Sequence, residues 1–134
     1  MSADGVGNFD NDDAMDWAFD LEQVKNNAFI EETLKVVTER GDEYLEAPEA
    51  YRALAAAEVV AALKHGASSG LPIEVKQWVS KYKQRPISSN LTQLALMAIQ
   101  RIQTASELKE LWEETDYAAD WYEVLDDLEV RLKG

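Results

Sequence analysis

Apolar residues recur at helical spacing along most of the chain, and no stretch alternates for long as a strand would. The pattern predicts a first helix that begins near Asp10, which is a suitable N-cap, with Asp13 placed close to a capping box. The apolar face of this helix holds Ala14, Trp17, Ala18, Leu21 and Val24. A second helix is expected over residues 28–39, with Ile30, Leu34 and Val37 inward and a break at Gly41.

The third expected helix runs from Pro48, in its first turn, to His65, and Gly66 ends it. Its segment 53–63, ALAAAEVVAAL, is apolar nearly all round, which is typical of a central, buried helix. We therefore predict an all-α fold, a single compact bundle of six or seven helices around the Ala-rich helix 50–65. Residues 1–134 form one domain in this interpretation, with 1–8 as a loose lead-in.

Further along the chain, Pro72 opens a short helix through Val75, Trp78 and Val79. Ser88, Ser89 or Asn90 caps a helix over about residues 91–103, and Ser106 starts the next one. The last helix is expected to start at Thr115 or Asp116. Its inward residues are Trp121, Val124, Leu125, Leu128 and Leu132, and we expect Trp17 and Trp121 to be buried core residues.

The 134 residues carry a net charge of −13, and this charge is unevenly placed. Residues 1–50 have 14 acidic and 3 basic side chains, 51–105 have 2 and 7, and 106–134 have 10 and 3. Such a chain repels nucleic acid and attracts cationic partners. With no cysteine, no apolar run near 18 residues and a polar, acidic start, we expect a cytoplasmic, bacterial-type protein without a membrane span.

Two sets of carboxylates are candidate binding faces for a basic protein. Asp12, Asp16 and Asp20 are spaced four apart, and like charges at that spacing weaken a helix by roughly 0.2–0.5 kcal/mol per pair. Capping explains Asp10 and Asp13 but neither Asp16 nor Asp20, and the calcium-loop pattern fails because Ala14, Met15 and Leu21 stand at its key positions. The second set is Asp116, Asp120, Glu123 and Asp127, expected on one helix face beside Trp121 and Tyr122. Ordinary solvated faces are the alternative for both sets.

Glu58 is the only acidic residue between Tyr51 and Ile73, and it lies in the helix expected to be central. A lone buried carboxylate is unfavourable, so we expect a partner: Arg101, a tryptophan N–H or backbone N–H groups at a helix start. Its role is either structural or that of a catalytic acid with a raised pKa. A single histidine, His65, without cysteine does not make a typical zinc site, and no cofactor motif occurs.

The segment 76–85, KQWVSKYKQR, interleaves basic and aromatic residues. This pattern occurs in proteins that bind nucleic acid, but the acidity of the rest of the chain favours charge complementarity with its own acidic ends.

Three stretches carry a resemblance: residues 7–21 (GNFDNDDAMDWAFDL), 55–63 and 106–132. Together they resemble the bacterial domain-of-unknown-function family 4259. The matching residues are Gly7, Phe9, Asn11, Asp12, Ala14, Asp16 and Trp17, the block 56–60, and Glu110, Leu111 and Trp112. The start departs from the family, which often has Gly-x-Trp-Gly where this chain has SADGV. The resemblance brings no established activity, but it directs attention to Asn11, Asp12, Asp16, Trp17 and Glu58.

Two functional hypotheses follow. The first is a small, acidic, non-catalytic interaction protein without a cofactor, of the immunity type that neutralises a basic toxin. The alternative is a metal-binding or enzymatic domain that uses a carboxylate cluster of Asp12, Asp16 and Glu58, with oxygen ligands for a divalent cation. A basic toxin encoded by the neighbouring gene would favour the first.

Overall fold

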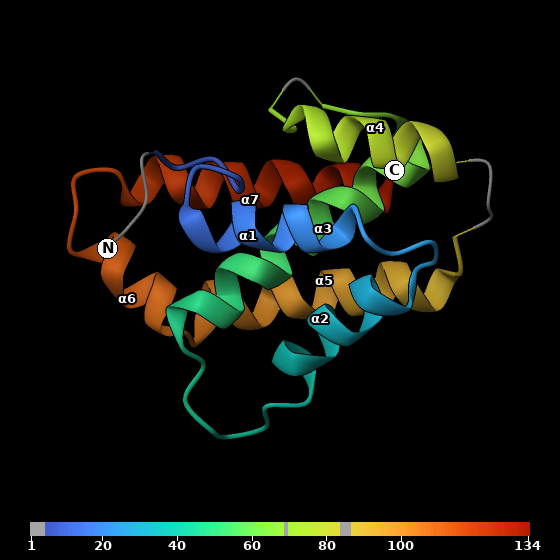
Figure 1. The fold of residues 1–134 in the computed structure, drawn as a ribbon. Coiled ribbons are helices and arrows are strands. Elements are labelled where there is room, and N and C mark those ends of the chain that lie inside the picture. The colour runs from blue at the N-terminus through green and yellow to red at the C-terminus, as the bar shows by residue number, and fades with distance from the viewer. Residues whose placement is uncertain (1–4, 69, 84–86) are drawn as a thin grey trace.

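In the computed structural model, which describes residues 5–68, 70–83 and 87–134, those residues fold into seven helices and no β-strand (Figure 1). The all-α prediction is confirmed. The helices are α1 (Asp12–Leu21), α2 (Ala28–Thr38), α3 (Ala47–His65), α4 (Ile73–Tyr82), α5 (Ser89–Thr104), α6 (Glu107–Glu113) and α7 (Ala118–Lys133). Within the described ranges, no helix is both long and apolar enough to cross a membrane.

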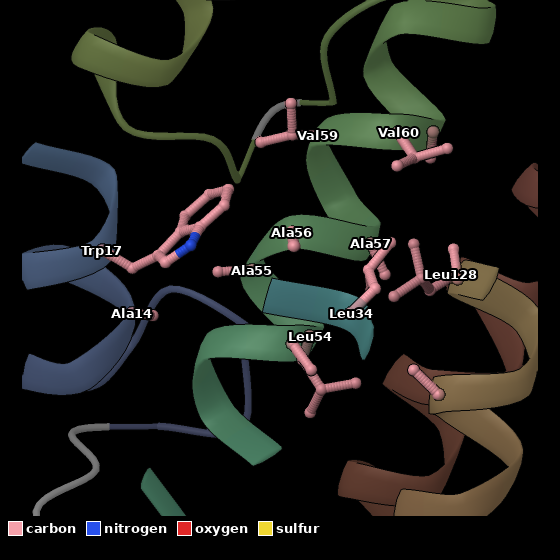
Figure 2. Close-up of a cluster of buried hydrophobic side chains, with 14 of the residues drawn as sticks. Ala14, Trp17, Leu34, Leu54, Ala55, Ala56, Ala57, Val59, Val60 and Leu128 are labelled. Atoms are coloured by element: carbon pink, nitrogen blue, oxygen red, sulfur yellow. The ribbon is translucent and has the colours of Figure 1, made fainter. Parts of the chain in front are cut away.

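Helix α3 lies at the centre of the bundle, because it contacts each of the other six helices. Of its 19 residues, 14 are buried, and most of these are alanine or valine. Small side chains let neighbouring helices approach closely, which suits a helix that is covered on all sides. Figure 2 shows Trp17 of α1 beside Ala55, while Leu34 of α2 and Leu128 of α7 lie toward Ala57.

The periodicity predicted most helices to within a few residues. Ile30, Leu34 and Val37 of α2 are buried, as are Val75, Trp78 and Val79 of α4. Ser88 caps α5 by accepting from the Leu91 N–H at 3.1 Å, and Ser106 caps α6 by accepting from the Lys109 N–H at 3.0 Å. The core therefore rests on the amphipathic faces that the sequence shows.

The ends of α1 and α7 differ from the prediction. Asn11, in extended backbone, is the N-cap of α1, and its Oδ1 accepts from the Ala14 N–H at 2.7 Å. Asp10 was therefore the wrong cap, and Asp13 forms no capping box because it stands at the second helical position. Helix α7 begins at Ala118, and Thr115 Oγ1 accepts from the Tyr117 N–H in the turn before it.

Replacing Asn11 with alanine should lower the free energy of unfolding by about 1 kcal/mol, because the Ala14 N–H loses its acceptor. Urea unfolding followed by circular dichroism measures this change. Asp10→Ala is the control, since the Asp10 side chain is exposed and accepts only from the Gly7 N–H in the described part of the chain. A larger loss for Asp10→Ala than for Asn11→Ala would contradict the cap assignment.

Candidate binding site

Asp12, Asp16 and Asp20 form what we call the α1 acidic column, on the exposed side of that helix. All three residues are exposed, and within the ranges that the structure describes none of their carboxylates forms a hydrogen bond or an ion pair. The other side of α1 is buried and contacts α3 and α4. The helix is thus held by its apolar side. Asp12, in the first turn, is favoured by the helix dipole, whereas Asp16 and Asp20 lie beyond that turn and add like-charge repulsion.

A second acidic group, which we call the α7 acidic row, consists of Asp120, Glu123 and Asp127. These residues are exposed and line a shallow depression of about 470 Å³ together with Val6 and Val124. Asp116 is exposed as well, but it precedes the first residue of α7 and so does not extend this helical row. The row therefore combines negative charge with a small apolar floor.

Glu58 is buried in α3 with 7% of its surface exposed, and its carboxylate binds residues from both ends of the described chain. Arg131 of α7 donates from Nη1 to Oε1 at 2.8 Å and from Nη2 to Oε2 at 3.1 Å. Asn8 donates from Nδ2 to Oε2 at 2.8 Å. The hydrogen bond to the Glu58 carboxylate raises the pKa of the Arg131 guanidinium, so Arg131 stays charged over the physiological range.

Arg101, which the sequence suggested as the partner of Glu58, has another role. Its guanidinium donates to the backbone carbonyl oxygens of Gly41, Glu43 and Ala105 at 2.7–2.8 Å. It thereby ties the loop after α2 to the C-terminal end of α5, where a cation is also favoured by the helix dipole. Glu58 and Arg101 consequently serve different parts of the fold.

A cavity of about 330 Å³ lies beside the Glu58–Arg131 pair. Among the described residues that line it, the charges come from the carboxylates of Asp10, Glu58 and Asp127 and from the guanidinium of Arg131. Asp127 Oδ2 accepts from Arg131 Nε at 3.0 Å, so Arg131 bridges a buried and an exposed carboxylate. The cavity adjoins the α7 acidic row, with Asp127 and Val124 lining both hollows.

The turn before α1 is built around the carboxylate of Asp10. Asp10 Oδ2 accepts from the Gly7 N–H at 3.0 Å, and the Asp10 N–H donates to the Gly7 carbonyl oxygen at 3.0 Å. A Cβ atom at Gly7 would lie 2.6 Å from Asp10 Oδ2, so the turn favours glycine there. Asn8, within this turn, is 6% exposed and bound to Glu58, although the sequence suggested a loose lead-in up to residue 8.

The model of one protein family, Domain of unknown function (DUF4259), matches residues 2–124 of the 134-residue chain. The chain belongs to the DUF4259 family. This confirms the family resemblance read from the sequence. The comparisons with curated proteins and with solved structures found no match, so the function of this DUF4259 protein has to be argued from its own residues.

The carboxylates of the alternative hypothesis lie in different settings in this DUF4259 protein. Asp12 and Asp16 are exposed on α1, whereas Glu58 is buried in α3 and bound to Arg131. Within residues 5–68, 70–83 and 87–134, no group of three acidic or histidine side chains is placed to hold a metal ion. The arrangement therefore offers no observation that favours metal-dependent chemistry over binding.

In the basic segment 76–85, residues 76–82 belong to α4 and Lys83 is its C-cap. Trp78 is buried and donates from Nε1 to the Val24 carbonyl oxygen at 3.0 Å, and Lys81 lies 5.5 Å from the ring centroid of Tyr82. In the described stretch up to residue 83, no lysine of this segment forms an ion pair with the acidic ends. Arg85 falls outside the described residues.

Sequence reasoning missed Asn8 and Arg131 as members of a polar site. Asn8 lies between Gly7 and Phe9, which carry the family resemblance, but is not itself one of the matching residues, so no sequence pattern indicated a role for it. Arg131 follows Asp127 by four residues, a spacing that indicates an ion pair on one helix but says nothing of a partner 73 residues earlier. The sequence contains one sign of the turn that holds Asn8: Gly7 lies three residues before Asp10, and a glycine at this place is typical of a tight turn.

Proposed function

We propose that this DUF4259 protein is a non-catalytic interaction protein that binds a basic protein partner through its acidic helix faces. The observation that carries the proposal is the α1 acidic column. Its three carboxylates repel one another and have no partner in the described parts of the chain, and α1 packs through its opposite side. The repulsion within this column lowers helix stability slightly. Favourable electrostatic interaction with a cationic partner is the simplest physical effect that would offset this loss.

Both acidic sets suit rapid association with a basic surface. A protein of net charge −13 with exposed acidic rows on α1 and α7 attracts positive charge over a distance of about one Debye length, roughly 8–10 Å at moderate salt. Steering of this kind raises association rates more than it raises affinity. The α1 acidic column and the α7 acidic row would attract the partner during the encounter. Apolar contacts beside them would then stabilise the complex.

Immunity proteins that neutralise a basic toxin, such as a nuclease, are often small and acidic, and this chain of 134 residues with a net charge of −13 shares both properties. We therefore propose the immunity type, acting in the bacterial cytoplasm, as the finer form of this function. The neighbouring gene should then encode a basic toxin, and co-expression with this protein should restore growth. Toxicity that is unchanged by co-expression would reject the immunity form and leave binding of another basic partner to be tested directly.

Binding to a synthetic peptide rich in lysine and arginine tests the wider proposal by calorimetry at low and at physiological salt. Asp16→Asn/Asp20→Asn should bind about fivefold more weakly than the unmodified protein and should lose part of the salt dependence. The control is Asp42→Asn/Glu46→Gln, which removes the same charge from exposed positions in the loop between α2 and α3, away from α1 in Figure 1. Equal weakening in both variants would show that only net charge matters, against the proposal.

A further inference from the structure

We propose that the cavity beside Glu58 and Arg131 receives the guanidinium group of an arginine side chain of the basic partner. The inference rests on the proposed function, because the arginine belongs to that partner. It adds a specific pocket to a surface that otherwise acts through general electrostatic attraction. The pocket is formed where the turn at residues 7–10 meets α3 and α7, and Ser68, Gly70 and Leu71, between α3 and α4, complete the described lining.

The charges around the cavity favour a cation. Asp10, Glu58 and Asp127 contribute three negative charges, and Arg131 alone offsets one of them among the described lining residues. Three N–H groups of Arg131 already donate to Glu58 and Asp127, so these carboxylates shield its positive charge from an incoming anion. A positively charged group would leave this network intact and offset one of the two remaining negative charges.

Acceptor atoms of the lining are left for such a cation. Asn8 Oδ1 is buried and has no hydrogen-bond partner in the described part of the chain, although Nδ2 of the same side chain is bound to Glu58. Asp10 and Asp127 each use Oδ2, for Gly7 and Arg131 respectively, and no hydrogen bond within the described ranges uses their Oδ1 atoms. A donor-rich ligand that approaches this wall, with a small shift of Asn8, gains these acceptors.

A guanidinium suits the acceptors of Asn8, Asp10 and Asp127 better than an ammonium group does. It presents five N–H donors in one plane and can serve several separate acceptors, whereas the ammonium of lysine is a compact and strongly hydrated charge. The neighbouring hollow is lined by Val6 and Val124, and the two hollows share Val124. The aliphatic part of an arginine side chain can therefore pack on apolar surface while its head enters the cavity.

The test is a titration of the whole protein with N-acetyl-arginine amide, followed by NMR of backbone amides. The signals of Gly7, Asn8 and Arg131 should shift with a dissociation constant in the millimolar range, about what a ligand of this size reaches. N-acetyl-citrulline amide, which has the same shape but no charge, should shift them far less. Asp127→Asn should weaken binding of the arginine compound at least about fivefold.

Asp126→Asn is the matched control. It removes the same charge from the residue that precedes Asp127 in α7, and the Asp126 carboxylate accepts from Gln103. It should leave the affinity nearly unchanged. Equal shifts with the citrulline or the corresponding lysine compound, or equal losses in both variants, would overturn the guanidinium pocket. Peptide binding that responds to Asp16→Asn/Asp20→Asn while the arginine compound does not bind would reject this pocket alone and leave the proposed function standing.

Discussion

Replacing Trp121 with alanine should lower the free energy of unfolding by about 3–5 kcal/mol, the range for removing a large aromatic side chain from a core. Trp121 is 1% exposed and is the largest of the fully buried side chains on α7. Its loss would leave a void that the helices around it can only partly fill. Trp17, 2% exposed and stacked on Phe29 with ring centroids 5.3 Å apart, should behave similarly.

Guanidinium unfolding followed by circular dichroism measures this loss, since removal of a tryptophan would complicate a fluorescence signal. Tyr117→Ala is the control, because Tyr117 is 60% exposed just before α7 and should change stability by no more than about 0.5 kcal/mol. A loss below about 1 kcal/mol for Trp121→Ala would mean that the α7 packing described above is incorrect.

Arg131→Met should lower the free energy of unfolding by about 3 kcal/mol, and Glu58→Gln by roughly half as much. The difference follows from burial. Without Arg131, the Glu58 carboxylate stays 7% exposed with Asn8 as its remaining partner in the described structure. Without the Glu58 charge, the Arg131 side chain is still 28% exposed and still paired with Asp127, so it reaches both water and a counter-ion.

The double variant Glu58→Gln/Arg131→Met completes a thermodynamic cycle by urea unfolding. Its loss should be smaller than the two single losses added together by about 1 kcal/mol or more, because the second change removes a group that the first left unpaired. Strictly additive losses, or a larger loss for Glu58→Gln than for Arg131→Met, would show that the pair contributes little and that the buried end of the network lies elsewhere.

The core of this fold could be predicted from sequence because its signal is local and repeated. The alanines and valines of residues 53–63 leave no polar side except Glu58, so a helix there has to be central, and α3 contacts all six other helices. The inward faces of α2 and α4 also followed from helical periodicity alone. These predictions needed no knowledge of which helix packs on which.

The polar site could not be predicted in the same way. Asp10 and Asn11 are equally good caps by residue type, and only the backbone shows that Asn11 takes the role while Asp10 holds the turn at Gly7. The partner of Glu58 depends on how α7 is placed against α3, a long-range arrangement that residue spacing does not encode. Arg101, the partner named from sequence, was therefore wrong, and the bond to Arg131 follows only from the packing of α7 on α3.

We propose that the α1 acidic column is kept for a partner and not for the fold. The free energy of unfolding of Asp16→Asn/Asp20→Asn, measured with and without the basic peptide, tests it most directly. Without peptide, the variant should equal the unmodified protein or exceed it by a few tenths of a kcal/mol, since two like-charge contacts are removed. With peptide, the unmodified protein should gain more stability than the variant, because ligand binding to the folded state stabilises it by an amount that increases with affinity.

Two results would contradict a role of the α1 acidic column in binding. A clear loss of stability in the variant without peptide would show that Asp16 or Asp20 supports the fold. If peptide raised the free energy of unfolding of both proteins equally, the α1 acidic column would take no part in binding.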